Sequence, residues 1–103
     1  MNIQQKIQIT EDPVKQKIVP PKKYKVLLLN DDFTPMDFVV MLLEDIFFMS
    51  EERAMAIMLT VHHSGQGLCG IYVKDIAQMK VNQVVSLARA NEYPLQCIME
   101  EEE

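Results

Sequence analysis

The feature that most restricts the fold is a nearly continuous apolar run, Tyr24 to Leu29, which stops at a polar turn, Asn30 to Asp32. A short run of this kind is typical of a strand buried on both faces, and such a strand lies at the centre of a sheet. Beyond the turn, Thr34 has the character of an N-cap and Pro35 of a first helical residue, and Asp37 lies three residues after Thr34 as in a capping box. We therefore predict a central strand, a rigid turn and a helix.

Apolar residues at helical spacing and glycines or prolines at the breaks predict the elements that follow. Ser50 is the expected cap of the second helix, and Gly65 and Gly67 are expected to end it. The predicted elements are, in order, a helix at 35–48, a helix from Ser50 to near His62, a strand at 68–73, a short turn at 76–79 that Asp75 caps, a helix from Val81 to near Asn91, a strand at 95–99 and a solvated acidic stop at 100–103.

The order β-α-α-β-α-β predicts an α/β fold of the α+β type in a single domain. A helix pair returns the chain antiparallel, whereas one crossover helix makes the second and third strands parallel, so the sheet is expected to be antiparallel with order 2-1-3 and three helices packed on it. Cys69 and Cys97 then lie on the two outer strands with the first strand between them, which is too far for a disulfide. We expect both to be small core residues.

Charge and composition separate a tail from a body. Residues 1–23 contain three prolines and neither an aromatic residue nor a glycine, which predicts a flexible N-terminal extension before a domain at 24–103. The net charge of −5 disfavours nucleic acid or an anionic membrane as the main partner. The extension carries a formal charge of +3 and the remainder −8, and this acidic body suits a cationic ligand. Neither a signal peptide nor a membrane-spanning stretch is recognisable, and we expect a cytoplasmic protein.

Polar side chains are expected to gather where the first strand and the second helix end. Asn30 follows the strand, and His62 lies near the helix end, above the apolar stripe of that helix pair. Three hypotheses for these residues do not involve a peptide ligand. Asp31 and Asp32 could be turn residues beside a solvated histidine pair; His62 could be a base beside one of them, although a nucleophile is missing; or a metal could bind Asp31, Asp32, His62 and His63, although adjacent helical residues diverge.

The fourth hypothesis is a site for the N-terminus of a peptide. An α-ammonium group is a compact cation with three donors, and amide, carboxylate and neutral imidazole groups all offer acceptors. An apolar hollow beside them would take the first side chain. A buried Leu or Phe contributes about 1.5–3 kcal/mol and each hydrogen bond to a charged group about as much, which is compatible with micromolar affinity.

The chain resembles one family in several short motifs. These are Tyr24-Lys25-Val26, Asn30-Asp31-Asp32-Phe33-Thr34-Pro35-Met36, Glu52-Arg53-Ala54, Val61-His62, Cys69-Gly70, Ala88-Arg89 and Glu92-Tyr93-Pro94-Leu95. They are similar to the ClpS adaptor family over about residues 22–99. The resemblance implies an adaptor, not an enzyme, that binds N-degrons beginning with Leu, Phe, Tyr or Trp. It also implies delivery of these substrates to the N-terminal domain of a ClpA-type AAA+ unfoldase of the Clp protease, by a monomer without cofactor or metal.

The resemblance also implies residue roles. Asn30, Asp32 and His62 would hold the α-amino group, and Asp31 would meet the peptide backbone that follows. Met36 resembles the family's gatekeeper against β-branched first residues. The implied hydrophobic pocket consists of Leu29, Thr34, Met36, Val39, Met58, Val61 and Leu95. Asp75 and Lys80 fall where the family docks on the unfoldase, although Asp75 replaces the more usual Glu. The extension would engage the unfoldase during delivery.

A second function is compatible with the same element order. It resembles the C-terminal domain of the ribosomal stalk protein, a protein-docking domain without a ligand pocket. The two hypotheses predict different surfaces: a docking domain presents an exposed helix face, whereas an N-degron adaptor gathers its functional residues where a strand end and a helix end meet.

Overall fold

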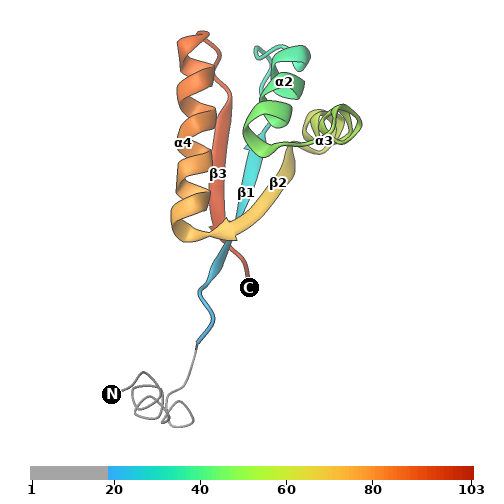
Figure 1. The fold of residues 1–103 in the computed structure, drawn as a ribbon. Helices are drawn as coiled ribbons and strands as arrows, with labels where there is room; N and C mark the ends of the chain where they lie inside the picture. The colour runs from blue at the N-terminus through green and yellow to red at the C-terminus, as the bar shows by residue number, and fades with distance from the viewer. Residues whose placement is uncertain (1–18) are drawn as a thin grey trace, which may run out of the picture.

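The computed structural model describes residues 19–103 of the chain, which form a three-stranded sheet packed with three helices (Figure 1). The elements are β1 (Lys23–Leu29), α2 (Met36–Phe47), α3 (Glu51–Ser64), β2 (Gln66–Val73), α4 (Lys74–Ala90) and β3 (Gln96–Glu101). This is the predicted β-α-α-β-α-β order. Within the described residues no helix is long and apolar enough to cross a membrane.

The sheet has the predicted order β2-β1-β3, and β1 pairs antiparallel with both neighbours. Val26, Leu27 and Leu28 are all buried, so consecutive residues on opposite faces of β1 avoid solvent, as expected for a central strand. The β1–β2 register shifts between Val26 and Leu27. An extra residue of β2 is accommodated at this irregularity.

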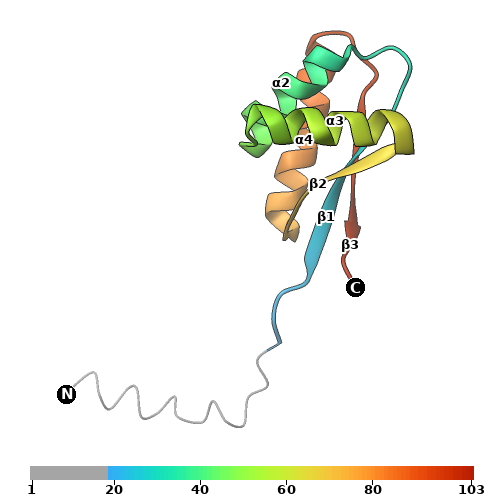
Figure 2. The same cartoon turned by 90° about the vertical axis from the view of Figure 1, so that its right-hand side faces the viewer.

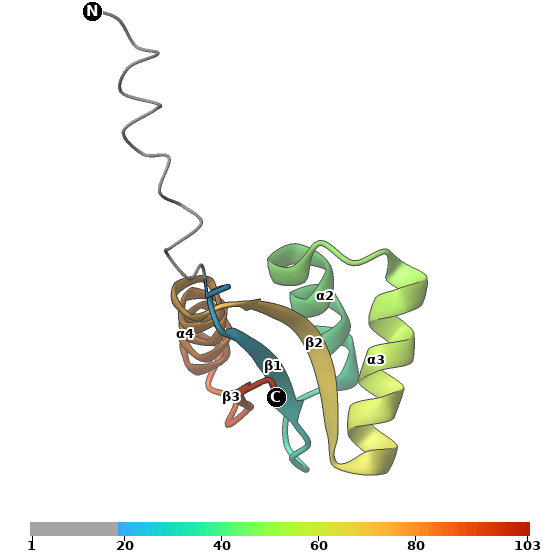
Figure 3. The same cartoon turned by 90° about the horizontal axis from the view of Figure 1, so that it is seen from below.

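The three helices lie on the same side of the sheet in Figure 2, and Figure 3 shows α4 towards the β3 edge with α2 and α3 towards the β2 edge. The core fills the space between these helices and the sheet. Its largest fully buried side chains are Leu28, Leu42, Leu43, Leu95, Val26 and Val84. The helix stripes read from the sequence therefore face the sheet, which is the burial that stabilises an amphipathic helix.

The ends of α3 are those that the sequence predicts. The Ser50 hydroxyl accepts a hydrogen bond from the Arg53 N–H at 3.2 Å, and Glu51 and Glu52 occupy the first turn. At the other end Gly65 adopts the left-handed conformation with φ 91°, where a residue with a Cβ is strained. These caps fix where α3 stops, and that position decides where His62 lies.

Cys69 and Cys97 are free and buried, as predicted. Cys97 on β3 is opposite Leu28 of β1, and Cys69 lies on β2, at the other side of β1. Burial raises the pKa of each thiol to about 12. The two side chains therefore behave as small apolar core residues.

Two predicted boundaries are wrong. The separate turn and helix expected around Asp75 form one helix, α4, which begins at Lys74 and whose N-cap position, Val73, has no side-chain cap. The acidic end is not a stop either, because Glu100 and Glu101 continue β3 opposite Lys25 and Tyr24. Pairing with β1, together with the 3.3 Å ion pair of Lys22 and Glu101, extends the strand even though its acidic side chains are exposed.

The predicted flexible extension, residues 1–23, falls mainly outside the described residues, which begin at Val19. Residues 19–22 have no regular secondary structure and are exposed, and β1 begins at Lys23, one residue before the predicted domain boundary.

Lys80 links α4 to the end of α2. Its side chain is only 8% exposed, and its ammonium donates a 2.6 Å hydrogen bond to the carbonyl of Ile46 in the last turn of α2. The rings of Phe47 and Phe48 lie 5.7 and 4.8 Å from the nitrogen. A cation at this place satisfies an unpaired carbonyl and opposes the negative end of the α2 dipole.

We predict that Lys80→Met lowers the free energy of unfolding by about 1 kcal/mol, because it removes the hydrogen bond and the charge but keeps an apolar stem. Urea denaturation measures the change. Lys74→Met on the same helix is the matched control, since Lys74 is the exposed first residue of α4, and it should leave stability nearly unchanged. Equal stability of Lys80→Met and the native protein would exclude this role of the ammonium.

Candidate functional site

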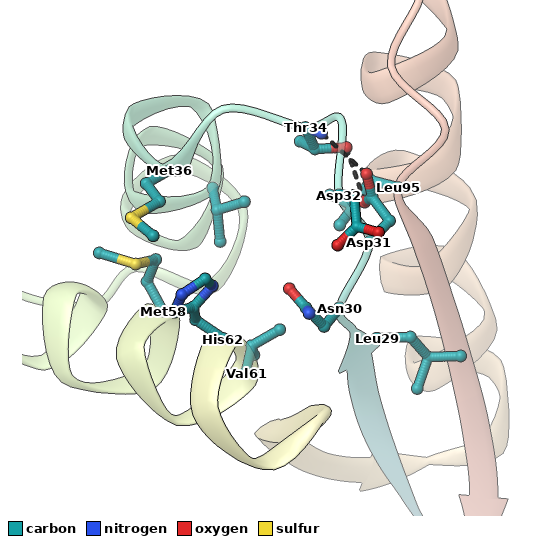
Figure 4. Close-up of a pocket in the computed structure, with 11 residues that line it drawn as sticks. Leu29, Asn30, Asp31, Asp32, Thr34, Met36, Met58, Val61, His62 and Leu95 are labelled. Carbon is teal, nitrogen blue, oxygen red and sulfur yellow. Dashed lines mark hydrogen bonds between the residues drawn. The ribbon is translucent and has the colours of Figure 1, made fainter.

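A pocket of about 180 Å³ opens where β1, α2 and α3 converge with the segment before β3 (Figure 4). The eleven residues that line it are the eleven that the sequence analysis assigned to N-degron binding. They are Leu29, Asn30, Asp31, Asp32, Thr34, Met36, Val39, Met58, Val61, His62 and Leu95. The fold therefore brings together residues that are up to 66 positions apart, from Leu29 to Leu95, in one concave site.

The end of β1 is joined to the end of α3 by a backbone hydrogen bond. The N–H of Asn30 donates to the carbonyl of Gly65 at 2.9 Å, directly beyond the Leu29–Gln66 pair of the sheet. Gly67 lets the β2 backbone pass close to α3, because a Cβ there would lie 2.7 Å from Cγ2 of Val61. His62 precedes Gly65 by less than one helical turn, so its ring is held across the pocket from Asn30.

The turn after β1 is organised by Asp31, not by the predicted N-cap. Asp31 Oδ1 accepts hydrogen bonds from the N–H groups of Phe33 and Thr34, and Oδ2 accepts one from the Thr34 hydroxyl, all at 2.8 Å. The prediction of a Thr34 cap with Asp37 as its partner is therefore wrong. α2 starts at Met36 with extended Pro35 in the N-cap position and no side-chain cap, because the carboxylate already holds the threonine hydroxyl.

The environment of Asp31 favours its ionised form. Partial burial by itself raises the pKa of this carboxyl, but the hydrogen bonds from Phe33 and Thr34 and the positive charge of Arg89 outweigh it, so the pKa lies below its usual value. Three of the four lone pairs of the carboxylate are occupied, and one on Oδ2 remains for a further donor.

The pocket has an apolar floor and a polar rim. Leu95, Val39, Met58 and Val61 are buried, while Met36 is 45% exposed at the mouth. Asn30, Asp32 and His62 are exposed rim residues, and Asn30 and His62 face one another across the pocket in Figure 4. Within residues 19–103 none of these three side chains forms a hydrogen bond with the protein, so their acceptor atoms are available to a ligand.

Arg89 supports the site although pattern analysis gave it no role. Its Nη1 donates to the carbonyl oxygens of Tyr93 and Leu95 at 2.7 and 2.8 Å. These bonds fix the segment that places Leu95 in the floor, and Phe38 adds an edge-to-face contact with Tyr93 at 4.8 Å. The available signal was an arginine in the last turn of a helix, where carbonyl groups lack partners.

The other predicted residues lie elsewhere or diverge. His63 contacts the ring of His62 at 5.1 Å but does not line the pocket. In the part of the chain that the structure describes, no three His, Cys, Asp or Glu side chains are placed to hold a metal ion. Asp75 and Lys80 belong to α4, outside the pocket, and the ammonium of Lys80 is bound to Ile46.

We predict that Asp31→Ala lowers the free energy of unfolding by about 1 kcal/mol at pH 7, because three hydrogen bonds to the turn are lost. A lowered pKa in the folded state means that the carboxylate stabilises the native protein above the pKa of an unfolded aspartate and loses this effect as pH falls through the folded-state pKa. The difference from the native protein should therefore shrink below about pH 4.

Urea denaturation at pH 7, 5 and 3.5 measures this difference. Asp45→Ala is the matched control, because Asp45 is an exposed carboxylate on α2 that makes no side-chain hydrogen bond within residues 19–103, and it should change stability little at any of these pH values. A deficit of Asp31→Ala that is as large at pH 3.5 as at pH 7 would contradict stabilisation by the charged carboxylate.

Comparisons with known proteins give concordant results. The sequence profile of the family described as "ATP-dependent Clp protease adaptor protein ClpS" matches residues 19–98. The ATP-dependent Clp protease adapter protein ClpS of Nitrosospira multiformis is 58% identical over 87 residues, covering 84% of this chain and 85% of its own length. The protein of the same name from Neisseria gonorrhoeae is 58% identical over 83 residues, covering 81% and 80%.

A solved structure is similar in fold and in sequence. Agrobacterium tumefaciens ClpS2 bound to L-phenylalaninamide superposes with a TM-score of 0.79 at 38% identity, covering 81% of this chain and all of that one. The residues that the family profile matches, 19–98, include β1, β2, the three helices and all the residues that line the pocket. The chain belongs to the ClpS family of adaptor proteins of the ATP-dependent Clp protease.

Proposed function

We propose that this adaptor binds the N-terminal residue of proteins that begin with Leu, Phe, Tyr or Trp and delivers them to the Clp protease. The observation that carries the proposal is the combination, in one pocket, of three rim side chains with free acceptors and a floor of buried apolar groups. The ammonium of a peptide N-terminus supplies three donors to Asn30, Asp32 and His62. Its side chain enters the apolar floor.

The size of the pocket supports a large unbranched or aromatic first side chain. Its volume is about 180 Å³, and an engineered apolar cavity of about 150 Å³ is sufficient for benzene. L-Phenylalaninamide, the ligand of the Agrobacterium protein, joins a free ammonium, a benzyl group and an amide that imitates the next peptide bond. Each part has a counterpart here, with the open lone pair of Asp31 available to the N–H of the following residue.

Met36 is proposed as the gatekeeper of this pocket. It stands at the mouth with 45% of its surface exposed, opposite the turn that Asp31 holds. A first residue with a branched Cβ carries bulk where the backbone passes this side chain, whereas Leu and the aromatic residues carry theirs deeper in the pocket.

We predict that fluorescence anisotropy detects micromolar or tighter binding of a peptide with a free N-terminal Leu or Phe, and at least tenfold weaker binding when the first residue is Ile or when the amino group is acetylated. Acetylation removes the charge and two donors, and the β-branch of Ile meets Met36. Comparable affinity for free Leu, Ile and acetyl-Leu peptides would contradict the proposal.

Two variants test whether a rim side chain contributes to peptide affinity. His62→Leu removes an acceptor at an exposed position, and it should weaken the Leu peptide about tenfold. His63→Leu is the matched control, because His63 is also exposed but lies outside the pocket, and it should leave affinity unchanged.

The protein-docking alternative without a ligand pocket receives less support. Its predicted mark is an exposed helix face in place of a cluster at strand and helix ends. The functional residues instead converge on a pocket at those ends, and the family is one of protease adaptors.

The unfoldase partner is proposed to be of the ClpA type, bound through its N-terminal domain to the first half of α4 by a monomer in the cytoplasm. Asp75 lies exposed in the first turn of α4, and Ile76 and Met79 are exposed apolar side chains beside it. Lys80 is expected to contribute by holding the end of α2 against α4, since its ammonium already has a partner.

We predict that Asp75→Lys weakens association with the N-terminal domain of a ClpA-type unfoldase about tenfold, because it reverses the charge of an exposed contact, while the Leu peptide binds as before. Surface plasmon resonance measures the first and anisotropy the second. Glu92→Lys makes the same change in charge beyond the C-terminal end of α4, far along the helix from Asp75, and is the control. Equal weakening by both variants would point to net charge instead of a defined contact.

A further inference from the structure

A second hollow lies beside the pocket, on the other side of Met36 and Met58. It is a groove of about 310 Å³ between α2 and α3. Met36 and Met58 line both the pocket and the groove, and Figure 4 shows their side chains close together at the edge of the pocket. These two side chains therefore stand between the position of a first residue and the groove.

The bottom of the groove is apolar and adaptable. Val40, Met41 and Met55 line it in addition to the two shared methionines, and Met55 is 46% exposed. Methionine is unbranched and polarisable, which lets such a surface adjust to apolar side chains of different shapes. The groove can thus bury an apolar side chain without demanding one particular shape.

The rim of the groove is acidic. Asp37, Glu44 and Glu51 line it, and within residues 19–103 none of them forms an ion pair. Lysine and arginine are absent from its lining. A segment that contains apolar side chains flanked by basic ones is complementary to this surface, whereas acidic segments are repelled.

We propose that this groove is a second subsite of the adaptor, which binds a later apolar side chain of the same polypeptide whose N-terminus occupies the pocket and favours Lys or Arg beside it. The inference rests on the proposed N-degron function. Two observations support this occupant over an unrelated partner: the groove is continuous with the pocket through Met36 and Met58, and its charge suits a cationic segment. An extended chain advances by about 3.3 Å per residue, so a few residues pass these two side chains.

The test uses peptides with a free N-terminal Leu, Gly and Ser spacers, and a Lys-Leu-Lys segment whose central Leu is placed at the fourth, fifth or sixth position. The parent peptide has Ser in place of that Leu. Fluorescence anisotropy should show that the best-placed second Leu tightens binding about fivefold, and that replacing the two lysines by glutamates weakens it by a similar factor at low salt.

Matched variants on α3 assign the gain to the groove. Met55 lines the groove and Leu59 does not, yet they are 46% and 44% exposed, so both tolerate a polar residue. Met55→Gln should abolish the gain from the second Leu and leave the parent peptide unaffected, and Leu59→Gln should preserve the gain. Persistence of the gain in Met55→Gln, or its loss in both variants, overturns the assignment.

The remaining outcomes distinguish this inference from the function on which it rests. If the parent peptide binds but no second Leu improves binding, the second subsite is refuted and the N-degron pocket stands. If neither peptide binds, both fail. If the two-Leu peptide binds equally well when its amino group is acetylated, the groove is an independent site and the shared occupant is refuted.

Discussion

One backbone hydrogen bond, from the N–H of Asn30 to the carbonyl of Gly65, is the constraint on which the site depends. It lies where the central strand leaves the sheet and where α3 ends in a left-handed glycine. This bond fixes the end of β1 against the end of α3. The amide of Asn30 and the imidazole of His62 therefore face the same space, even though helix α2 and most of α3 separate them in sequence. A longer α3, or a strand that ended one residue earlier, would remove this opposition.

The polar side chains near the pocket and the helix ends fall into two groups: some bond to the protein itself, and others leave their acceptors open. Asp31 spends most of its hydrogen-bonding capacity on its own turn, Arg89 on the backbone before β3, and Lys80 on the end of α2. Asn30, Asp32 and His62, the residues proposed to hold the ammonium group, make no side-chain hydrogen bond to the protein within residues 19–103. A site for a cation thus avoids the cost of an unpaired buried charge, because its free acceptors stand at a solvated rim and the bound charges are already paired with backbone groups.

The sequence determined the sheet order and the meeting point of strand and helix, because the apolar run at 24–29, the Ser50 cap and the Gly65 stop are local signals with direct structural meaning. Periodicity placed Val39, Met58 and Val61 on inward faces, whereas Leu95 and the limits of the pocket came from the family resemblance. Local rules failed where a distant partner decided the outcome. Asp31 bonds to the Thr34 hydroxyl that was predicted to cap α2, and pairing with β1 continues β3 through Glu100 and Glu101. A single helix, α4, stands where a turn and a helix were predicted.

The direction of β1 gives the molecule two separate working ends. The strand begins at Lys23, pairs along its whole length, and finishes beside the pocket, so its seven residues span about 20 Å between the place where the preceding chain enters and the place where a ligand binds. The first turn of α4 follows directly on Val73, the partner of Lys23, and so shares the entry end. The pocket proposed for the N-degron and the surface of α4 proposed for the unfoldase therefore lie at opposite ends of the central strand, so the two proposed partners do not compete for surface.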